Sequence, residues 1–369
     1  MSLTKKMRSL SRTLRRKITK GERKYTPDPK TPITNWLVDR KRHCNGGRTV
    51  DAGLWLKKHC DNGGKIFLSL AGAASTFQQG IDISEMIKKG KIAAVSATGA
   101  NLEESAYRLL ANSHYAYIRD YNELTREEEK ELDDVGFRRI TDTFLPEDES
   151  VRKLLSKFIR LMREAMKTGK YLLWHEYFFE LFERGWVKFD GDPEQCWLYQ
   201  AWKHKVAVFV PGVEDSTMGN IAAYFTYSGD HKFLSKYKQK KPIDSKVILH
   251  SFSYMHRLAE WYMDNTKKKG LAYLQYGGGI AGDFAICVVP HLKKDYCANL
   301  PLNVQEKLVR SWAGFIEIHS SPMTFGSYSG AGFKEKITWS KFNVTAFGCQ
   351  ICGDYTEHGP DICAIVLGK

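Results

Sequence analysis

The hydrophobic pattern changes from helical to strand-like spacing early in the chain. From Val50 to Cys60 apolar residues recur at the spacing of one helix face, and Asp61–Gly64 is a typical helix stop. The next segment, Lys65–Ala71, is an almost continuous apolar run, which is typical of a strand buried on both faces of a parallel sheet. It runs into the small-residue turn Gly72–Ser75 and a further helical segment. The sequence therefore predicts a strand–turn–helix unit here.

This strand–turn–helix order recurs along the chain. The further apolar runs that we interpret as strands are Ile92–Ser96, Val206–Val210, Gly270–Gln275, Gly314–Ser321 and Phe347–Ile351. Strands that alternate with helical segments predict a parallel sheet, because parallel neighbours need a crossover connection. We therefore expect an α/β fold with a mostly parallel, Rossmann-like central sheet, helices on both faces and a helical N-terminal extension. The segments Tyr121–Arg138 and Val151–Phe189 are also expected to be helical.

Small and polar residues follow several of these strands at their carboxyl ends, where ligands bind in open α/β sheets. Thr98–Glu104 follows the second strand and opens a helix, and the loop Pro211–Asn220 follows the third with carboxylate, hydroxyl and amide groups. Three successive glycines, Gly277–Gly279, follow the fourth and leave backbone N–H groups free to face an anion or a flat ring. No Gly-x-Gly-x-x-Gly is present, so the residues alone fit a nucleotide site or plain flexible turns equally well.

The stretch Met323–Phe342 combines a glycine-rich turn with a short amphipathic segment. In a helix Glu335 and Trp339 share a face, and Lys341 reaches the same pocket if the helix ends or bends before it. An ammonium held against an indole is desolvated, which favours the neutral, nucleophilic amine. The alternative that composition alone favours is an ordinary surface helix with a solvated lysine.

The pattern Ser-Gly-Ala-x-x-x-Glu-x-x-x-Trp-x-Lys, at Ser329–Lys341, resembles the active-site signature of the deoxyhypusine synthase family, most closely its bacterial deoxyhypusine synthase-like branch. The likeness runs from about Pro32 to the C-terminus, with several motifs in family order. It implies that Lys341 is the nucleophile and carries a 4-aminobutyl group as an imine. Trp339 and Glu335 would line the polyamine site. We accordingly divide the chain into a basic N-terminal arm, residues 1–31, and an NAD-binding catalytic domain, residues 32–369.

The same resemblance implies NAD as the cofactor and a set of residues that bind it. These are Gly72, Ser75, Thr98, Gly99, Glu104, Asp215, Gly278, Ser320, Ser329 and Asp354. It also implies three substrate-binding positions, Asn220, Asp283 and Tyr328, where the eukaryotic pattern has aspartate, histidine and aspartate. Each lost carboxylate removes a charge-assisted hydrogen bond to a polyamine, worth about 1.5–3 kcal/mol. The pocket is still expected to take an amine, while the identity and pose of the donor stay open.

Two functions from different classes fit these residues. The first is NAD-dependent transfer of a 4-aminobutyl group from spermidine or a related polyamine, through the lysine imine, to a small diamine or a protein lysine. The second is a catalytically silent paralogue that regulates or scaffolds another protein. Retention of Lys341, Trp339 and Glu335 together favours the transferase. Because paired subunits share active sites in the family, the resemblance also implies a homotetramer.

The positive charge of the chain is concentrated at its beginning. The formal net charge is +14, and residues 1–24 carry ten Lys or Arg against a single acid, Glu22. We expect a solvated, frayed arm here rather than an arm that binds an anionic partner. Nothing in the remainder resembles a nucleic-acid-binding motif, so nucleic acid is not an expected partner.

Membrane and metal partners are not expected either. No apolar run approaches the roughly 20 residues of a membrane helix, and residues 1–24 lack the hydrophobic centre of a signal peptide. We therefore expect a cytoplasmic protein, in which eight cysteines indicate free thiols. Cys349, Cys352, His358 and Cys363 could be written as a zinc site, but Phe347–Cys352 fits a buried strand equally well, and we expect no metal.

Overall fold

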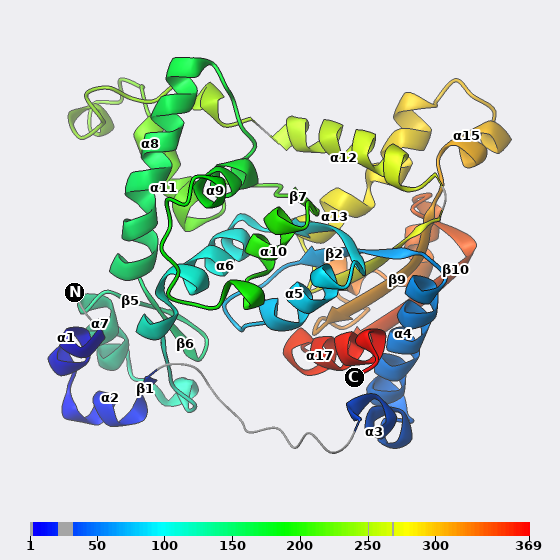
Figure 1. Ribbon diagram of the computed structural model, residues 1–369, viewed down its shortest axis with the longest axis horizontal. Helices are drawn as coiled ribbons and strands as arrows, with labels where there is room; N and C mark the ends of the chain where they lie inside the picture. Colours follow the sequence, from blue (N-terminus) through cyan, green and yellow to red (C-terminus); the bar gives the residue numbers. More distant parts are fainter. Residues whose placement is uncertain (1–2, 21–31, 250, 268) are drawn as a thin grey trace.

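A parallel six-stranded sheet forms the centre of the protein, for which the computed structural model describes residues 3–20, 32–249, 251–267 and 269–369 (Figure 1). The strands, in the order in which they lie side by side, are β10 (Phe342–Cys352), β9 (Trp312–His319), β8 (Leu271–Tyr276), β2 (Lys65–Leu70), β3 (Ile92–Ala97) and β7 (Ala207–Phe209). Every neighbouring pair in this sheet is parallel. The predicted α/β fold with a parallel central sheet is confirmed.

The direction in which the chain adds strands reverses between β2 and β8. Counted along the chain from β2, the sheet order is 3-2-1-4-5-6, which is the order of dinucleotide-binding folds. At the reversal point the Ala71 N–H donates to the Tyr276 carbonyl at 3.0 Å, so the loops after β2 and β8 start side by side. They then diverge, to α5 (Gly80–Lys88) and to α13 (Ile280–Ile286). A crevice at the carboxyl ends of the strands is expected at such a point.

Helices cover both faces of the parallel sheet. On one face α17 (Tyr355–Leu367) contacts α5, α4 (Cys44–Asp61) and α3 (Ile33–Arg40). On the other face α13 contacts β2, β3, α12 (Ser251–Asn265) and α14 (Val288–His291) (Figure 1). The remaining helices are α6 (Gly99–Ala111), α8 (Lys153–Thr168), α9 (Trp174–Glu183), α10 (Trp197–Lys203), α11 (Thr217–Thr226), α15 (Leu302–Leu308) and α16 (Phe333–Thr338).

Aromatic side chains hold the central strands at a fixed separation. Phe67 on β2 stacks on Tyr273 of β8 with ring centroids 5.5 Å apart, and Trp312 of β9 meets both rings edge-on at 5.3 and 4.9 Å. All three side chains are buried, and the Trp312 indole N–H donates to the Ile286 carbonyl. Rings of this size bury more apolar area than other side chains do. These rings therefore form a core around the middle of β2 and β8 and the start of β9.

A second, antiparallel sheet lies beside the first and was not predicted. Its order is β1 (Thr19–Lys20), β4 (Ala116–Tyr117), β6 (Thr143–Pro146) and β5 (Phe137–Ile140). The predicted helix over Tyr121–Arg138 is right for α7 (Arg126–Asp134) and wrong beyond it. Gly136, with a φ of +78°, follows the end of α7, and Phe137 and Arg138 then pair with β6 in a hairpin. Strands of two to four residues carry too little hydrophobic pattern to be recognised from sequence.

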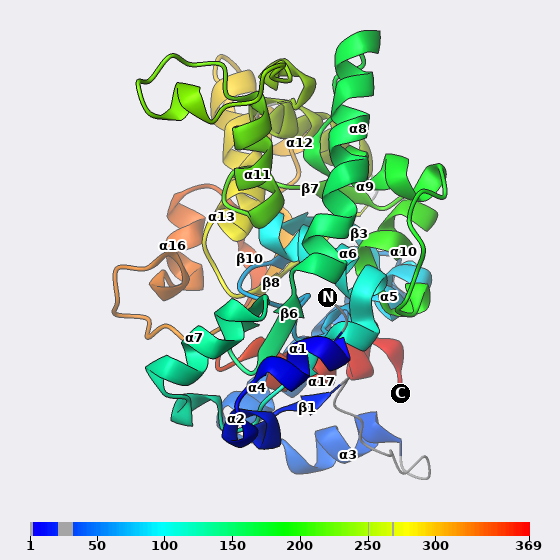
Figure 2. The ribbon, with the colours of Figure 1, turned by 90° about the vertical axis from the view of Figure 1, so that its left-hand side faces the viewer.

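The N-terminal extension folds against this antiparallel sheet. It consists of α1 (Leu3–Ser9), α2 (Arg12–Lys17) and β1, and lies at the same end of the molecule as α7 (Figure 2). The predicted helical extension is confirmed, but the expected solvated arm is wrong for residues 3–20, because Met7, Leu10 and Leu14 are buried in one apolar cluster. Met7 lies on α1, Leu14 on α2 and Leu10 between the two helices, so the burial of these residues depends on how the helices pack and was obscured by the charge count. The boundary proposed at residue 31 lies outside the described residues.

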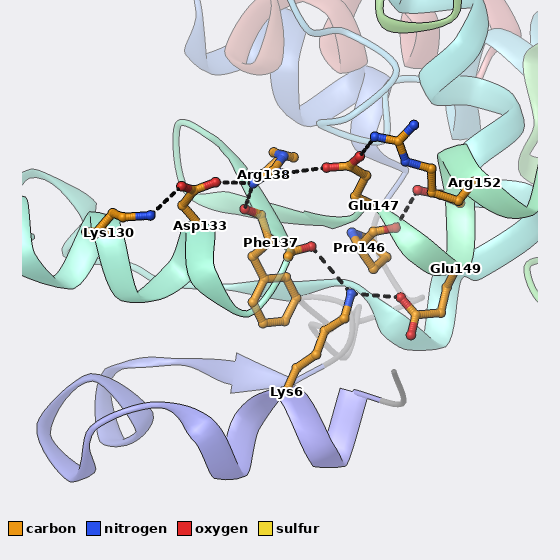
Figure 3. Close-up of polar contacts among 11 residues, drawn as sticks. Lys6, Lys130, Asp133, Phe137, Arg138, Pro146, Glu147, Glu149 and Arg152 are labelled. Atoms are coloured by element: carbon orange, nitrogen blue, oxygen red, sulfur yellow. Dashed lines mark hydrogen bonds and ion pairs between the residues drawn. The ribbon is translucent and has the colours of Figure 1, made fainter. Parts of the chain in front are cut away.

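Ion pairs fix the extension to its acidic surroundings. The buried Lys6 ammonium lies 2.9 Å from the Glu149 carboxylate and 3.4 Å from the Gly136 carbonyl (Figure 3). Lys17 pairs with Glu128 of α7 at 3.1 Å. The acidic segment around α7 thus supplies the countercharge for part of the basic N-terminus. Of the helices that the structure describes, none combines the length and the apolar character needed to cross a bilayer.

Candidate active site

The chain bends between Trp339 and Lys341, as the sequence analysis required. Helix α16 ends at Thr338, Ser340 has a φ of +60°, and the Lys341 N–H donates to the Lys336 carbonyl at 3.2 Å. The bend turns the Lys341 side chain into the protein just before β10 begins, and only 8% of that side chain is exposed. Lys341 is therefore an enclosed amine and not a solvated surface lysine.

A carboxylate and two aromatic rings surround the Lys341 ammonium. Its Nζ donates to Oδ1 of Asp283 at 2.9 Å, and it lies 5.8 Å from the ring centroid of Tyr328 and 6.0 Å from that of Trp339. Asp283 stands on α13, which follows β8, and its side chain is half exposed. The structure thus brings together Lys341, Asp283 and Tyr328 from three separate segments. An amine that is buried except towards a half-exposed carboxylate can be reached by a ligand from that side.

Glu335 and Trp339 lie at the outer side of this site. Both are exposed, Trp339 to 60%, so the indole meets the amine while most of its own surface points outward. The expectation that the indole encloses Lys341 is therefore met only in part, since Tyr328 and the burial of the lysine stem provide the rest. An exposed tryptophan beside an enclosed amine is available to a bound ligand or to a second chain.

Three polar side chains that were not predicted lie together on neighbouring strands of this region. Gln275 of β8, Glu317 of β9 and Gln350 of β10 occupy paired register positions, and all three are buried. Glu317 accepts hydrogen bonds from the Gln275 amide at 2.7 Å and from the Gln350 amide at 3.0 Å. Burial raises the pKa of Glu317 to about 7. The available signal was the occurrence of polar residues within otherwise apolar strands.

Lys336 is a second buried lysine beside Lys341 that the sequence analysis missed. Its Nζ donates to the Ala331 carbonyl at 3.0 Å and lies 4.8 Å from the Tyr328 ring centroid and 4.9 Å from that of Phe315. Burial lowers the pKa of Lys336, although Glu317 acts in the opposite direction. A helix of six residues is too short for hydrophobic periodicity to show which side chains point into the protein. The sequence therefore did not indicate that Lys336, next to Glu335, is buried.

The predicted cofactor turns meet at the reversal point of the sheet. Gly72 has a φ of +59°, and a Cβ there would lie 2.9 Å from the Tyr355 hydroxyl, which itself accepts from the Ala73 N–H. A Cβ on Gly278 would lie 1.9 Å from Oγ of Ser329. Only glycine permits this approach, so the turn after β8 touches the turn that precedes α16 and Lys341. Gly278 and Ser329 therefore lie next to each other, close to the segment that carries Lys341.

Four further predicted cofactor residues mainly make structural contacts in and around the turns after β2 and β3. They are Ser75, Thr98, Gly99 and Glu104. Ser75 bonds to Asn101 through its N–H and through its hydroxyl, which also accepts from the Trp197 indole. Thr98 caps α6, and Gly99 packs closely against Ser216. Glu104 is buried and accepts from Thr76, and burial raises its pKa to about 7. Asn101 is the residue that ties these turns together, because its amide also donates to the Gly72 carbonyl at 2.8 Å.

The other predicted positions are exposed and lie on separate segments. Asp215 belongs to the loop after β7 and Asn220 to the first turn of α11, where the Asn220 amide donates to the carbonyls of Glu214 and Ser216. Ser320 follows β9 and is exposed. Asp354 caps α17 by accepting from the Thr356 N–H, and it borders a cleft of about 420 Å³. The Asn220 amide thus bonds to the loop that precedes its own helix, and these contacts give no support for a polyamine-binding role.

The residues of the possible zinc site, Cys349, Cys352, His358 and Cys363, belong to β10 and α17. Cys349 is buried in β10, where its thiol donates to the Arg48 carbonyl, and burial raises its pKa to about 11. Cys352 is exposed, and His358 bonds to Thr49 at 3.0 Å. Within the described ranges, no three His, Cys, Asp or Glu side chains gather as metal ligands would. The interpretation of Phe347–Cys352 as a strand is confirmed.

Comparisons with known proteins agree with the motifs. A family model for deoxyhypusine synthase matches residues 44–365. A probable deoxyhypusine synthase of Picrophilus torridus is 25% identical over 309 residues, which cover 82% of this chain and 81% of the relative. A second one, of Thermoplasma acidophilum, is 26% identical over 307 residues, 82% of each chain. The crystal structure of an Entamoeba histolytica deoxyhypusine synthase candidate covers 94% of this chain and all of that one, with a TM-score of 0.51 at 10% identity, and so shares the fold.

Proposed function

Because this chain belongs to the deoxyhypusine synthase family and is thus a transferase, we propose that it moves a 4-aminobutyl group from spermidine, or a related polyamine, to an acceptor amine through an imine on Lys341. The observation that carries the proposal is the enclosed Lys341 amine, 2.9 Å from the Asp283 carboxylate. The carboxylate favours the ammonium form, but it is also within reach to accept the proton that the amine must lose before it attacks an electrophilic carbon. A purely regulatory subunit has no chemical need for this arrangement.

Lys341 would act on a donor that has already lost a hydride from the carbon next to its secondary amine. The neutral amine of Lys341 attacks the carbon of the resulting donor imine and forms a new C–N bond. The bond from this carbon to the diamine nitrogen then breaks, and that nitrogen leaves with the proton that Lys341 gives up. Asp283 is within hydrogen-bond reach of Lys341 and is the group placed to hold this proton in transit. The acceptor amine repeats the exchange in reverse and frees Lys341.

The residues present fit NAD as the cofactor. The strand order leads us to expect a crevice between β2 and β8, and Gly279, with a φ of +70°, has open space where a Cβ would stand. Backbone can therefore approach a flat ligand closely at this point. NAD, when bound, would accept the hydride that the donor loses and return it to the product, so that none is consumed. Gly278 and Ser329 link this crevice to the segment that carries Lys341.

We propose that a second chain completes the site. Trp339 and Glu335 face outward next to the enclosed amine, and an exposed indole would be dry only under a partner or a bound substrate. A homotetramer with shared active sites would supply that cover. Light scattering at micromolar concentration should give four times the chain mass of 42.2 kDa, whereas a monomer would contradict this part of the proposal.

The test of the proposed function is product formation. The protein is incubated with NAD and spermidine, once with putrescine and once with a lysine-containing protein fraction, and the products are identified by mass spectrometry. Transfer of the 4-aminobutyl group to either acceptor, with release of 1,3-diaminopropane, supports the proposal. If neither acceptor gains the group and no diaminopropane appears, the chain is better regarded as a regulatory subunit.

A further inference from the structure

The buried Gln275, Glu317 and Gln350 form one continuous hydrogen-bonded row across β8, β9 and β10. Each amide donates to a different oxygen of the Glu317 carboxylate, at 2.7 and 3.0 Å. This arrangement fits an ionised carboxylate, because a protonated carboxyl would direct one O–H against an N–H. The row therefore has its present hydrogen-bond pattern only while Glu317 carries its charge.

The carboxylate fixes the opposite end of each amide together with a backbone carbonyl, that of Gly277 for Gln275 at 2.9 Å and that of Ala331 for Gln350 at 3.3 Å. The Gln275 oxygen accepts from the Tyr328 hydroxyl at 3.3 Å, and the Gln350 oxygen accepts from the Phe333 N–H at 3.0 Å. Tyr328 is the ring beside the Lys341 ammonium, and Phe333 is the first residue of α16. If Glu317 gains a proton, one amide has to turn, and then either Tyr328 or Phe333 loses its acceptor. The charge on Glu317 is thereby coupled to the surroundings of Lys341.

Lys336 is joined to this row through the Ala331 carbonyl, which accepts from the Gln350 amide at 3.3 Å as well as from Lys336. Its side chain is buried, its Nζ is held by the Ala331 carbonyl at 3.0 Å, and it shares the Tyr328 ring with Lys341. Lys336 lowers the pKa of Glu317 and partly offsets the increase that burial causes. A buried charge without an opposite charge is costly, so each member of this pair favours the ionised form of the other.

We propose that Lys336 is a positioning residue for the transfer reaction: its buried ammonium keeps Glu317 ionised, and ionised Glu317 fixes the two amides that hold Tyr328 and the start of α16 around Lys341. The proposal rests on the proposed function for its catalytic readout. It assigns no contact with the substrate to Lys336. The other titratable groups coupled to Lys336 or Glu317 are Lys341, Asp283, Glu335, Tyr273, Tyr328 and the buried His319 of β9.

The transfer rate as a function of pH tests the proposal. In the wild type the rate should fall by about tenfold per pH unit below the titration of Glu317, whose pKa is about 7. Lys336→Met should move this acidic limb upward by about one pH unit, and the rate should approach that of the wild type in alkaline solution. Lys336→Arg keeps the charge and should keep the limb in place. Lys334→Met, an exposed lysine of the same helix, is the matched control and should change nothing.

Glu317→Gln provides a second, independent variant. A neutral amide cannot titrate, so this limb should disappear and the rate should be reduced by one factor at every pH. Circular dichroism first establishes that each variant is folded. If Lys336→Met lowers the rate equally at all pH values, or if the acidic limb persists in Glu317→Gln, the proposed positioning role is wrong.

A direct titration separates this proposal from the proposed function. In protein labelled with carbon-13 at the glutamate carboxyl, the Glu317 resonance is assigned by its absence in Glu317→Gln. The pH at the midpoint of its titration should be higher in Lys336→Met than in the wild type and unchanged in Lys334→Met. An unchanged midpoint in Lys336→Met would overturn the inference even if transfer occurs. A wild type that transfers no group would refute the proposed function and leave this titration as the deciding measurement.

Discussion

The Lys341 ammonium lies 2.9 Å from the Asp283 carboxylate, although 58 residues separate the two in the chain. Helix α13 follows β8 and runs back across the sheet, so that Ile286 at its end accepts from Trp312, the first residue of β9. Lys341 immediately precedes β10, whose first residue pairs with the same Trp312, and this brings the lysine to α13. A hydrogen bond to a charged group in a mostly buried site is worth about 1.5–3 kcal/mol. The pair therefore fixes the position of the proposed nucleophile and supplies its nearest proton acceptor.

Replacement of this carboxylate should slow transfer without unfolding the protein. Asp283→Asn keeps the shape of the side chain but removes the charge, so we expect transfer to fall by about 10- to 100-fold. The rate is measured by release of 1,3-diaminopropane. Asp295→Asn is the matched control, since Asp295 is an exposed acid paired with His291 and should leave the rate unchanged. Equal rates for Asp283→Asn and the wild type would mean that Asp283 holds no proton in the reaction.

Trp339 should matter for activity far more than for stability. Because its side chain is 60% exposed, Trp339→Ala should change the free energy of unfolding by no more than about 0.5 kcal/mol. Transfer should nevertheless fall at least about tenfold, since the indole adjoins the Lys341 amine. Trp36→Ala removes an indole that is 51% exposed on α3 and serves as the control in both assays. A rate loss shared by both variants would remove the special role of Trp339.

His175 should make the protein sensitive to mild acid. Burial lowers the pKa of His175 from 6.5 to about 3, so the unfolded chain binds a proton between these values that the folded chain does not. Its contribution to stability is therefore complete above pH 6.5 and is lost as the pH falls, by about 2 kcal/mol at pH 5. The free energy of unfolding is measured with urea above pH 6.5 and at pH 5. The difference between these two free energies should be smaller in His175→Gln than in the wild type. His204→Gln, at an exposed histidine, should retain the wild-type difference.

The N-terminal extension should detach when its buried ion pair is broken. Lys6 is fully buried against Glu149, and its removal takes away the ammonium that lies 2.9 Å from this carboxylate (Figure 3). Lys6→Ala should therefore make residues 3–20 sensitive to trypsin while the parallel sheet remains protected. Arg12→Ala, at an exposed position on α2, is the control. Equal cleavage rates in the two variants would show that Lys6 does not anchor the extension.

The parallel sheet could be predicted because its strands are apolar runs separated by helical spacing. The antiparallel sheet could not, since β1 and β4 have two residues each and their pairing depends on segments far apart in the chain. In the site, the Glu335–Trp339–Lys341 spacing correctly placed a bend before Lys341. The same spacing could not show that Lys336 points inward or that Glu317 lies near it, because both depend on how α16 packs on β9 and β10.

Covalent trapping tests the central claim most directly. The protein is incubated with NAD and spermidine labelled in the aminobutyl group, reduced with borohydride and digested, and the labelled peptide is sequenced by mass spectrometry. We predict label on Lys341 alone, and none in Lys341→Ala or in Lys341→Arg, because arginine keeps the charge but forms no imine. Lys334→Arg should label as the wild type does. Label on another lysine, or product formation without any label in the wild type, would contradict the assignment of Lys341 as the nucleophile.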